Sequence, residues 1–251
     1  MQEERGAEMK KHVEVRRAVL SAALILTVTH LVLALSPGAV LPAGGANHRV
    51  KVPAQPIRVA LTFDDGPHPV TTARLLDELA LREVQATFFV VGEFLPDNEP
   101  LIRRMAAEGH QIGVHSYSHT QITGLSKENF DLEVIQVRSQ LQATLGGEDY
   151  WLRPPYGLVD PSVELWADSP IILWSLDPED WKDRDVNRIT NQVLSQVKDG
   201  DIILFHDIYE SSVDAAIQVV DTLVQQDACF MTVEQLLQAK GITPEQGVIY
   251  R

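Results

Sequence analysis

Cysteine is almost absent from this sequence, and that scarcity excludes two classes of protein. The 251 residues include one cysteine, Cys229, which has no partner for a disulfide and cannot build a cysteine metal cluster. A disulfide framework and a cysteine-rich metal site are therefore excluded. Apolar residues flank Cys229 in the segment 227–231 (DACFM), so we expect a buried side chain with a small apolar role.

Positive charge is also scarce. The chain has 21 Lys and Arg against 35 Asp and Glu, which gives a net charge of −14. Residues 1–17 hold five basic and four acidic residues, so the remaining residues carry a net charge of about −15. No basic stripe is present. Nucleic-acid binding needs clustered Lys or Arg to release counterions, so we expect no nucleic-acid partner. The absence of a Gly-x-Gly-x-x-Gly turn and of a phosphate-binding loop disfavours nucleotide binding.

A long apolar run is present near the N-terminus. Residues 1–17 are charged, and residues 18–36 follow with an apolar stretch over Ala18–Leu35. This length suits a short membrane span or a long signal segment. Basic residues precede the stretch and the next one is Arg49, so the positive-inside rule predicts a cytoplasmic N-terminus and an extracytoplasmic remainder. We expect an uncleaved signal-anchor, with a cleaved signal peptide as the alternative, followed by a Pro-, Gly- and Ala-rich linker over 37–55.

Beyond the linker, patterns of strand and helix alternate. Apolar, β-branched runs predict strands at 57–63, 86–91, 111–114, 150–152, 171–174 and 201–205. Helical spacing predicts helices at 72–81, 99–108, 126–145 and 213–226, and further helices between the last three strands. Alternating βα units indicate an α/β fold with a mostly parallel sheet and helices outside. A (β/α) barrel and a doubly wound open sheet both place ligands at the carboxyl ends of the strands.

Two adjacent carboxylates end the first predicted strand. Asp64 and Asp65 lie in the segment 62–67 (TFDDGP), and successive side chains at a strand end point in different directions. One carboxylate can therefore bind a cation while the other stays free as a base. Two solvated carboxylates in a capped turn are the alternative.

Two histidines follow the third predicted strand. His115 and His119 have an H-x3-H spacing in the segment 115–119 (HSYSH), and on a helical turn residues i and i+4 face the same way, so both imidazoles can reach one ion. With one Asp they predict a divalent metal site, zinc by default, with cobalt, nickel and manganese as alternatives. A metal site beside a spare carboxylate is what metal-assisted hydrolysis requires. Two unrelated polar histidines are the alternative.

Three further segments carry candidate residues after predicted strands. In 153–157 (RPPYG), Arg153 can pair with a buried carboxylate, and the Tyr156 backbone N–H is suited to an oxyanion. In 177–181 (DPEDW), Trp181 offers an indole face to a sugar. In 204–207 (LFHD), His206 can act as a general acid once a carboxylate raises its pKa. A rigid surface loop, a Trp at the edge of the core and a structural His are the respective alternatives.

These five segments, in this order, resemble the NodB-type polysaccharide deacetylases, carbohydrate esterase family 4. The resemblance covers residues 56–241, leaves 242–251 as a tail, and implies a distorted, incomplete (β/α)7 barrel. It also implies a role for each matching residue: Asp64 as base, Asp65, His115 and His119 as metal ligands, Arg153 orienting Asp64, Asp180 pairing with the acid His206, Tyr156 binding the oxyanion, and Trp181 and Leu204 lining the sugar and acetyl-methyl pockets.

The resemblance implies a metal-dependent hydrolase that removes N-acetyl groups from an acetylated glycan. An outward-facing domain, anchored or secreted, would meet the N-acetylglucosamine of peptidoglycan first. Chitooligosaccharide and acetylxylan are alternative substrates. A non-catalytic glycan-binding domain and a hydrolase of small non-sugar amides are alternatives of other classes.

Overall fold

The computed structural model describes residues 56–147 and 150–251. The expected cytoplasmic segment, membrane segment and linker (1–17, 18–36 and 37–55) lie outside these described residues. Within the described ranges, no helix combines the length and the hydropathy needed to cross a bilayer.

Parallel strands form the centre of the described unit. The main sheet has the order β3 (Gln111–Val114), β2 (Thr87–Val90), β1 (Arg58–Asp64) and β5 (Asp201–His206), and every pairing is parallel. The short β6 (Cys229–Phe230) pairs with the first residues of β1. Because β1 pairs with β6 at its start and with β2 at its end, its partner changes along its length.

Single bridges extend the parallel pairing beyond β3 and β5. Leu152 bridges Val114 on one side and Ile171 on the other, and Leu176 bridges Ile203 of β5. Ile171 opens the two-residue β4 (Ile171–Ile172), which also pairs with the C-terminal β7 (Ile249–Tyr250). The segment 171–176 thus links the β3 side of the sheet to the β5 side.

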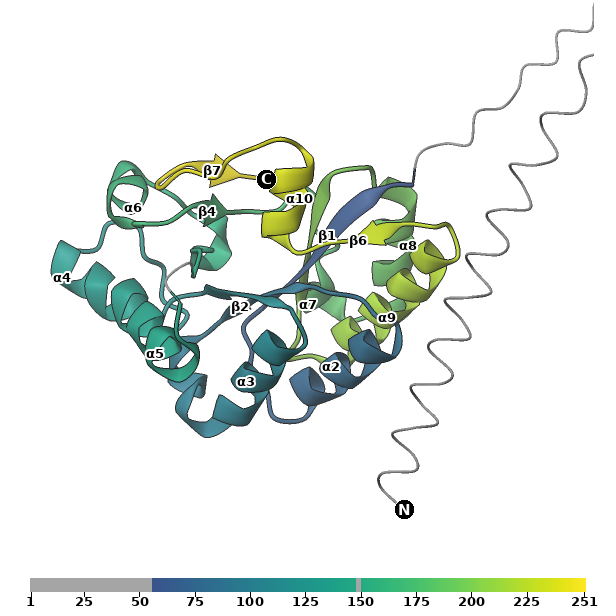
Figure 1. The fold of residues 1–251 in the computed structure, drawn as a ribbon, viewed down its shortest axis with the longest axis horizontal. Coiled ribbons are helices and arrows are strands. Elements are labelled where there is room, and N and C mark those ends of the chain that lie inside the picture. The colour runs from purple at the N-terminus through teal and green to yellow at the C-terminus, as the bar shows by residue number, and fades with distance from the viewer. Residues whose placement is uncertain (1–55, 148–149) are drawn as a thin grey trace, which may run out of the picture. The chain divides into compact units, whose positions relative to one another are not determined.

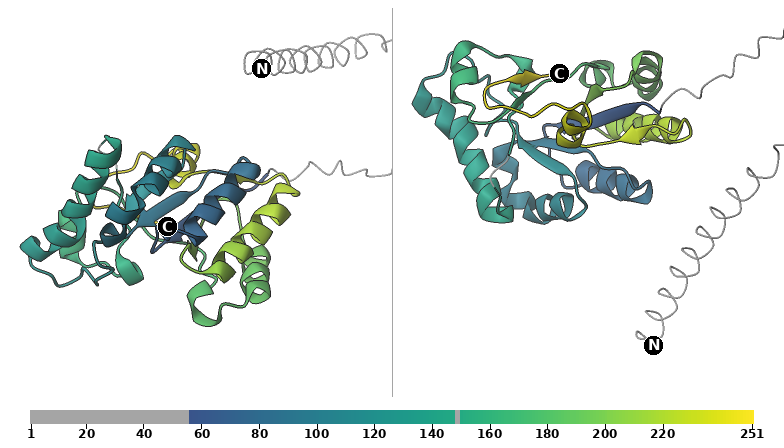
Figure 2. Two further views of the ribbon diagram at one scale, coloured as in Figure 1. Left: turned by 90° about the horizontal axis from the view of Figure 1, so that it is seen from below. Right: turned by 45° about the horizontal axis from the view of Figure 1, so that its top comes forward.

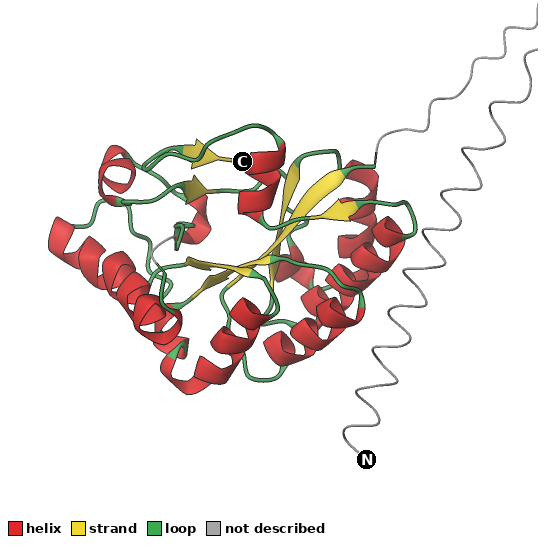
Figure 3. Cartoon of the chain, viewed as in Figure 1, coloured by secondary structure: helices red, strands yellow, loops and turns green. Residues whose placement is uncertain are grey.

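Helices surround the strands, as Figures 1 and 3 show. Their bounds are α2 (Thr71–Leu81), α3 (Glu99–Ala107), α4 (Lys127–Phe130), α5 (Gln136–Leu145), α6 (Pro161–Trp166), α7 (Asp180–Asp183), α8 (Val186–Gln196), α9 (Glu210–Val224) and α10 (Val233–Ala239). The 3-10 turns are η1 (Gly92–Phe94), η2 (Pro96–Asn98) and η4 (Pro155–Gly157), and a π-helical turn, η3 (Asp131–Ile135), joins α4 to α5. Helices α2 and α9 lie side by side (Figure 2).

Aromatic residues of neighbouring strands fill the core between sheet and helices. The ring of Phe63 stacks on Phe88 and Phe205, with centroid distances of 5.3 and 5.8 Å, and all three side chains are buried. Burial of each such side chain stabilises the fold by about 1.5–3 kcal/mol. Leu75 and Leu76 of α2 are also buried and belong to the same core.

Two local expectations were wrong, and a third needs a refinement. The predicted strand 150–152 is reduced to the single bridge at Leu152. The predicted helix 126–145 is present over 127–145, with a π-helical turn inside it. Cys229 is exposed rather than buried, because β6 is an edge strand of two residues and the Cys229 side chain faces outward. Alternation of apolar residues over such a short strand does not decide which face is covered.

Candidate active site

The predicted polar residues meet at the carboxyl ends of the parallel strands. Asp64 ends β1 and lies in register with His206, which ends β5. His115 directly follows β3. Both Asp64 and His115 are 2% exposed, so the edge of the sheet holds these groups in a nearly buried position.

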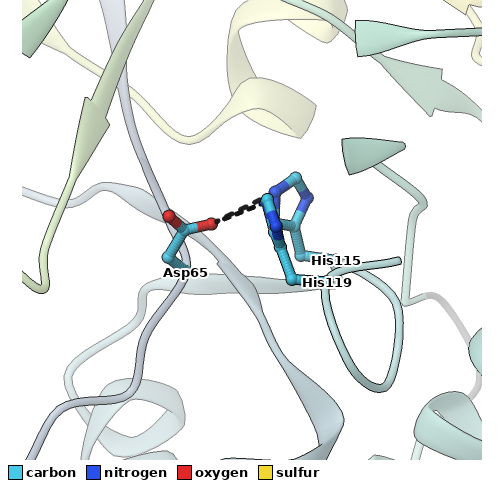
Figure 4. Close-up of side chains that lie close together, drawn as sticks. All are labelled: Asp65, His115 and His119. Atoms are coloured by element: carbon cyan, nitrogen blue, oxygen red, sulfur yellow. Dashed lines mark ion pairs between the residues drawn. The ribbon is translucent and has the colours of Figure 1, made fainter. Parts of the chain in front are cut away.

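Asp65, His115 and His119 converge on one point (Figure 4). The Nε2 atoms of His119 and His115 lie 3.2 and 3.5 Å from Oδ1 of Asp65. Nδ1 of His115 lies 2.8 Å from the carbonyl oxygen of Arg153, to which only a protonated Nδ1 can donate, so the neutral imidazole presents the lone pair of Nε2 to Asp65. Three electron-pair donors therefore face one another.

This donor set fits a divalent cation. Oδ1 of Asp65 is buried and has no hydrogen-bond partner among the described residues, which is costly unless a cation binds there. Burial raises the pKa of Asp65, but His115, His206 and His119 outweigh it and hold that pKa below its usual value. Burial lowers the pKa of His119, which favours the neutral imidazole that binds metal. Two imidazoles and a carboxylate suit zinc.

The two histidines do not lie on a helical turn, as the spacing suggested. Residues 115–120 form an irregular loop in which Ser116 and His119 have left-handed φ angles of 61° and 56°. The loop turns back on itself and brings the rings to a centroid distance of 5.1 Å. The prediction that both rings reach one point was right, but a strained loop rather than helical periodicity brings them together.

Asp64 is held by Arg153, as predicted. Nη1 of Arg153 donates to Oδ1 of Asp64 at 2.8 Å and to the hydroxyl of Thr62 at 2.7 Å, and Arg153 is completely buried. The guanidinium also donates to the carbonyl oxygens of Ile172 and Leu173. Asp64 is therefore fixed on one side by the buried guanidinium of Arg153. On the other side its Oδ2 lies 3.7 Å from Nε2 of His115.

His206 is held by Asp180, a residue at the start of α7. Asp180 is completely buried; its Oδ1 accepts from Nδ1 of His206 at 2.7 Å, and its Oδ2 accepts from the His206 backbone N–H at 2.8 Å. Burial lowers the pKa of His206, but the hydrogen bond and charge of Asp180, with Asp64 and Asp65, raise it to about 9. The imidazole is therefore protonated at neutral pH, with Nε2 left for a ligand.

A cavity of about 420 Å³ lies over these residues and is lined in part by Tyr156, Trp174, Trp181, Leu204 and Tyr209. Trp181 is 49% exposed and Leu204 is 3% exposed, so an indole lies at the rim and an apolar side chain at the base. Tyr156 has a left-handed φ of 61°, and no acceptor for its backbone N–H is found within the described ranges. Trp174 and Tyr209 were not predicted, because single aromatic residues after a strand carry no distinctive signal.

Asp207 directly follows His206 in the sequence, and no role was predicted for it. Asp207 is 1% exposed and its Oδ2 accepts from the hydroxyl of Thr72. Burial raises the pKa of Asp207, with a smaller contribution from the charge of Asp65, to about 7. Its carboxylate packs directly on Gly66, next to the candidate metal ligand Asp65.

Comparisons with known proteins identify the family. The family model described as polysaccharide deacetylase matches residues 51–169. Over 193 residues the chain is 35% identical to the peptidoglycan-N-acetylglucosamine deacetylase of Bacillus cereus, covering 74% of this chain and 70% of that protein. The chain belongs to the polysaccharide deacetylase family. It is also 38% identical over 182 residues to the peptidoglycan-N-acetylmuramic acid deacetylase PdaC of Bacillus subtilis, covering 72% of this chain but 39% of PdaC.

Solved structures of the family share the fold. The T48 deacetylase, determined with substrate, has a TM-score of 0.74 and 39% identity, and the match covers 78% of this chain and 97% of that one. The family 4 acetyl xylan esterase of Clostridium thermocellum, determined with a cobalt ion, has a TM-score of 0.73 and 32% identity, covering 77% and 97% of the two chains. The chain thus has the α/β fold with a parallel sheet of these deacetylases.

Proposed function

We propose that this protein is a metal-dependent hydrolase that removes N-acetyl groups from cell-wall glycan, with the N-acetylglucosamine of peptidoglycan as its substrate. The observation that carries the proposal is the convergence of Asp65, His115 and His119 beside a separate, Arg-held carboxylate, Asp64. One carboxylate serves the cation and the other remains free for proton transfer. This division of labour is what metal-assisted hydrolysis of an amide requires.

Asp65, His115 and His119 would hold the divalent ion, with zinc as first choice and cobalt as the alternative. When bound, the ion supplies Lewis acidity, which polarises a carbonyl and makes water more acidic. Two features prepare the histidines for a metal: the Arg153 carbonyl fixes the His115 tautomer, and burial lowers the pKa of His119, which favours its neutral form. The cobalt-containing esterase of the same family supports a metal in this fold.

Asp64 would accept the proton of the attacking water. It is nearly buried and fixed by Arg153, so its free oxygen keeps one direction. The water oxygen then bonds to the acetyl carbon, and the backbone N–H of Tyr156 would donate to the resulting oxyanion. That N–H is a fixed dipole, since Pro154 and Pro155 restrict the loop before it.

His206 would donate its proton to the departing nitrogen. Asp180 orients the ring through Nδ1, which leaves Nε2–H directed at the cavity. The C–N bond breaks as the nitrogen is protonated, and the products are acetate and a free amino sugar. Trp181 would stack on the sugar ring, and Leu204 would contact the acetyl methyl group.

The finer domain assignments are part of the same proposal. We infer a distorted, incomplete (β/α)7 barrel over residues 56–241, supported by the bridges at Leu152 and Leu176 that continue the parallel pairing. We also infer extracytoplasmic action, with a membrane anchor or cleaved signal at 18–36, from the apolar run and the basic residues before it. The cell-wall substrates in the names of the relatives support this location.

Relatives differ in the acetylated sugar that they are named for, so the substrate needs a direct test. The full chain would be stripped of metal, reloaded with zinc or cobalt, and given peptidoglycan, chitopentaose and acetylxylan in parallel. Metal-dependent acetate release from peptidoglycan is the expected result. Acetate release from chitopentaose alone, or from acetylxylan alone, would reject peptidoglycan and assign that glycan as the substrate. Glycan binding without acetate release, with the metal bound, would favour a non-catalytic binding domain.

A further inference from the structure

The carboxylate of Glu133 connects the loop that carries His119 to the helical segment that follows this loop in the chain. Oε2 of Glu133 accepts from the backbone N–H groups of Tyr117 and Ser118, both at 3.0 Å, and Oε1 accepts from the Ser118 hydroxyl at 2.9 Å. We propose that Glu133 is a positioning residue for the metal centre, which sets the place of His119 relative to Asp65. This inference rests on the proposed metal-dependent function of that site.

The two histidines are held in different ways. The ring of His115 is fixed by its own hydrogen bond from Nδ1 to the Arg153 carbonyl, and the side chain is 3% exposed. The ring of His119 makes no hydrogen bond within the described ranges. It packs in a T-shaped arrangement with the Tyr156 ring, at a centroid distance of 4.9 Å, and its side chain is 33% exposed. The position of His119 therefore depends on the backbone of its loop.

That backbone is in a conformation that needs support. Ser116 and His119 have φ angles of 61° and 56°, a region that non-glycine residues occupy only when their surroundings hold them there. The turn takes the N–H groups of Tyr117 and Ser118 out of any strand pairing, so both need another acceptor. Glu133 supplies it for both.

The backbone carbonyl groups of the loop that carries His119 are held by a different segment from the one that contains Glu133. The N–H groups of Gly92 and Glu93 donate to the carbonyl oxygens of Ser116 and Tyr117 at 3.0 and 2.9 Å. A side chain at Gly92 would overlap Val137 and Tyr117, so this turn lies directly against the loop. The peptides around Tyr117 are thus held from both sides, by η1 through their carbonyls and by Glu133 through their N–H groups.

Glu133 lies in the middle of the π-helical turn η3 (Asp131–Ile135). Such turns widen a helix locally and are frequent at functional sites. Val134, within this turn, and Val137, just after it, are completely buried, so a shift of the helix to follow the loop would disrupt core packing. The π-helical turn thus belongs to the support of the metal centre.

The test is the zinc affinity of the metal-stripped full chain, measured by competition with a chelating dye. The variants are Glu133→Ala, the isosteric Glu133→Gln and, as a control, Glu128→Gln, an exposed carboxylate on α4. We expect Glu133→Ala to weaken zinc binding by about 10- to 100-fold. This is the usual effect of removing a residue whose hydrogen bonds hold a metal ligand in place. Glu133→Gln should lose less, because its amide oxygen still accepts, and Glu128→Gln should match the wild type.

A second readout separates positioning from general stability. With cobalt bound, the visible absorption of Glu133→Ala should differ from that of the wild type, because one imidazole has moved. If Glu133→Ala does not fold, the zinc affinity of Glu133→Gln tests the inference, and we expect it to be below that of the wild type. Wild-type zinc affinity and an unchanged cobalt spectrum in the folded Glu133 variants would overturn the inference. A wild-type chain that binds neither metal would instead overturn the proposed function, and this inference with it.

Discussion

The carboxylate of Asp207 fills the space into which a side chain on Gly66 would point. Asp207 is buried at the end of β5, and Gly66 follows the candidate ligand Asp65 at the end of β1. The hydroxyl of Thr72 connects the two segments, since it donates to Asp207 and accepts from the His68 backbone N–H at 2.8 Å. The loop after Asp65 is therefore packed with no room for a methyl group.

Gly66→Ala should consequently destabilise the protein by about 1–3 kcal/mol, the usual cost of overpacking, and should weaken zinc binding. The measurements are urea unfolding and dye competition. The double variant Gly66→Ala with Asp207→Ala provides the control, because removal of the carboxylate makes room for the methyl group. Strict additivity of the two free-energy changes would show that the residues do not interact.

Asp64→Asn should keep its metal and lose turnover by about 10²- to 10⁴-fold, the contribution of a positioned base. Asp65→Asn should instead lose metal affinity. Acetate release and zinc content of both variants check the assignment together. A near wild-type rate in Asp64→Asn would reject this residue as the base.

Arg153→Met should destabilise the protein by about 3–5 kcal/mol, because Asp64 would remain buried without its partner. Arg74→Met is the matched control: its ion pair with Asp214 is more than 40% exposed on both sides, and such pairs are worth about 0–1 kcal/mol. Equal losses in urea unfolding would contradict the buried position of Arg153.

The rate of deacetylation should fall at alkaline pH. Acid catalysis needs protonated His206, whose pKa is raised to about 9 by Asp180, Asp64 and Asp65 against the effect of burial. The positive charge of a bound metal would offset the charges of Asp64 and Asp65 and so lower the pKa of His206. We therefore expect kcat/KM to fall on the alkaline side with an apparent pKa at or below 9. Asp180→Asn removes the largest factor that raises this pKa and should move the limb to lower pH. An unmoved limb in that variant would mean that another group sets it.

The metal-free protein should also show a pH-dependent stability that Asp207→Asn reduces. Burial raises the pKa of Asp207 to about 7, above the usual 3.8, so between these values the folded state binds more protons than the unfolded one. The contribution of protonated Asp207 to the free energy of unfolding is therefore fully present below pH 3.8. It is lost as the pH rises towards 7. Thermal unfolding of wild type and Asp207→Asn across this range gives the comparison, and identical slopes would contradict it.

The longer elements were predictable from the sequence because they carry a repeated pattern. The strands near 58–64 and 201–206 and the helix at 71–81 agree with the predictions within a few residues, since each buries several apolar side chains at a regular spacing. The short α7, β6 and β7 escaped prediction. Two to four residues are too few to show a period, and tertiary contacts alone define them.

The candidate site was predictable residue by residue, but its support was predicted only in part, at Arg153 and Asp180. Asp64, Asp65, His115, His119 and His206 stood out because reactive side chains cluster after apolar runs. Glu133 and Thr72 did not, because a Glu on a helix and a Thr at a helix start are ordinary in any sequence. Their importance depends on contacts between residues 15 or more positions apart, such as Thr72 and Asp207, which are 135 positions apart.

The register between β1 and β5 has one further consequence. Asp64 and His206 are direct neighbours across this pairing, so the same ladder of backbone hydrogen bonds sets the separation of their backbones. Arg153 and Asp180 then orient the two side chains, the group that would take a proton and the group that would give one. The backbone separation cannot change without disturbing the centre of the sheet. We therefore expect a change of substrate in such an enzyme to arise in the surrounding loops, because the strands that carry this pair also form the centre of the sheet.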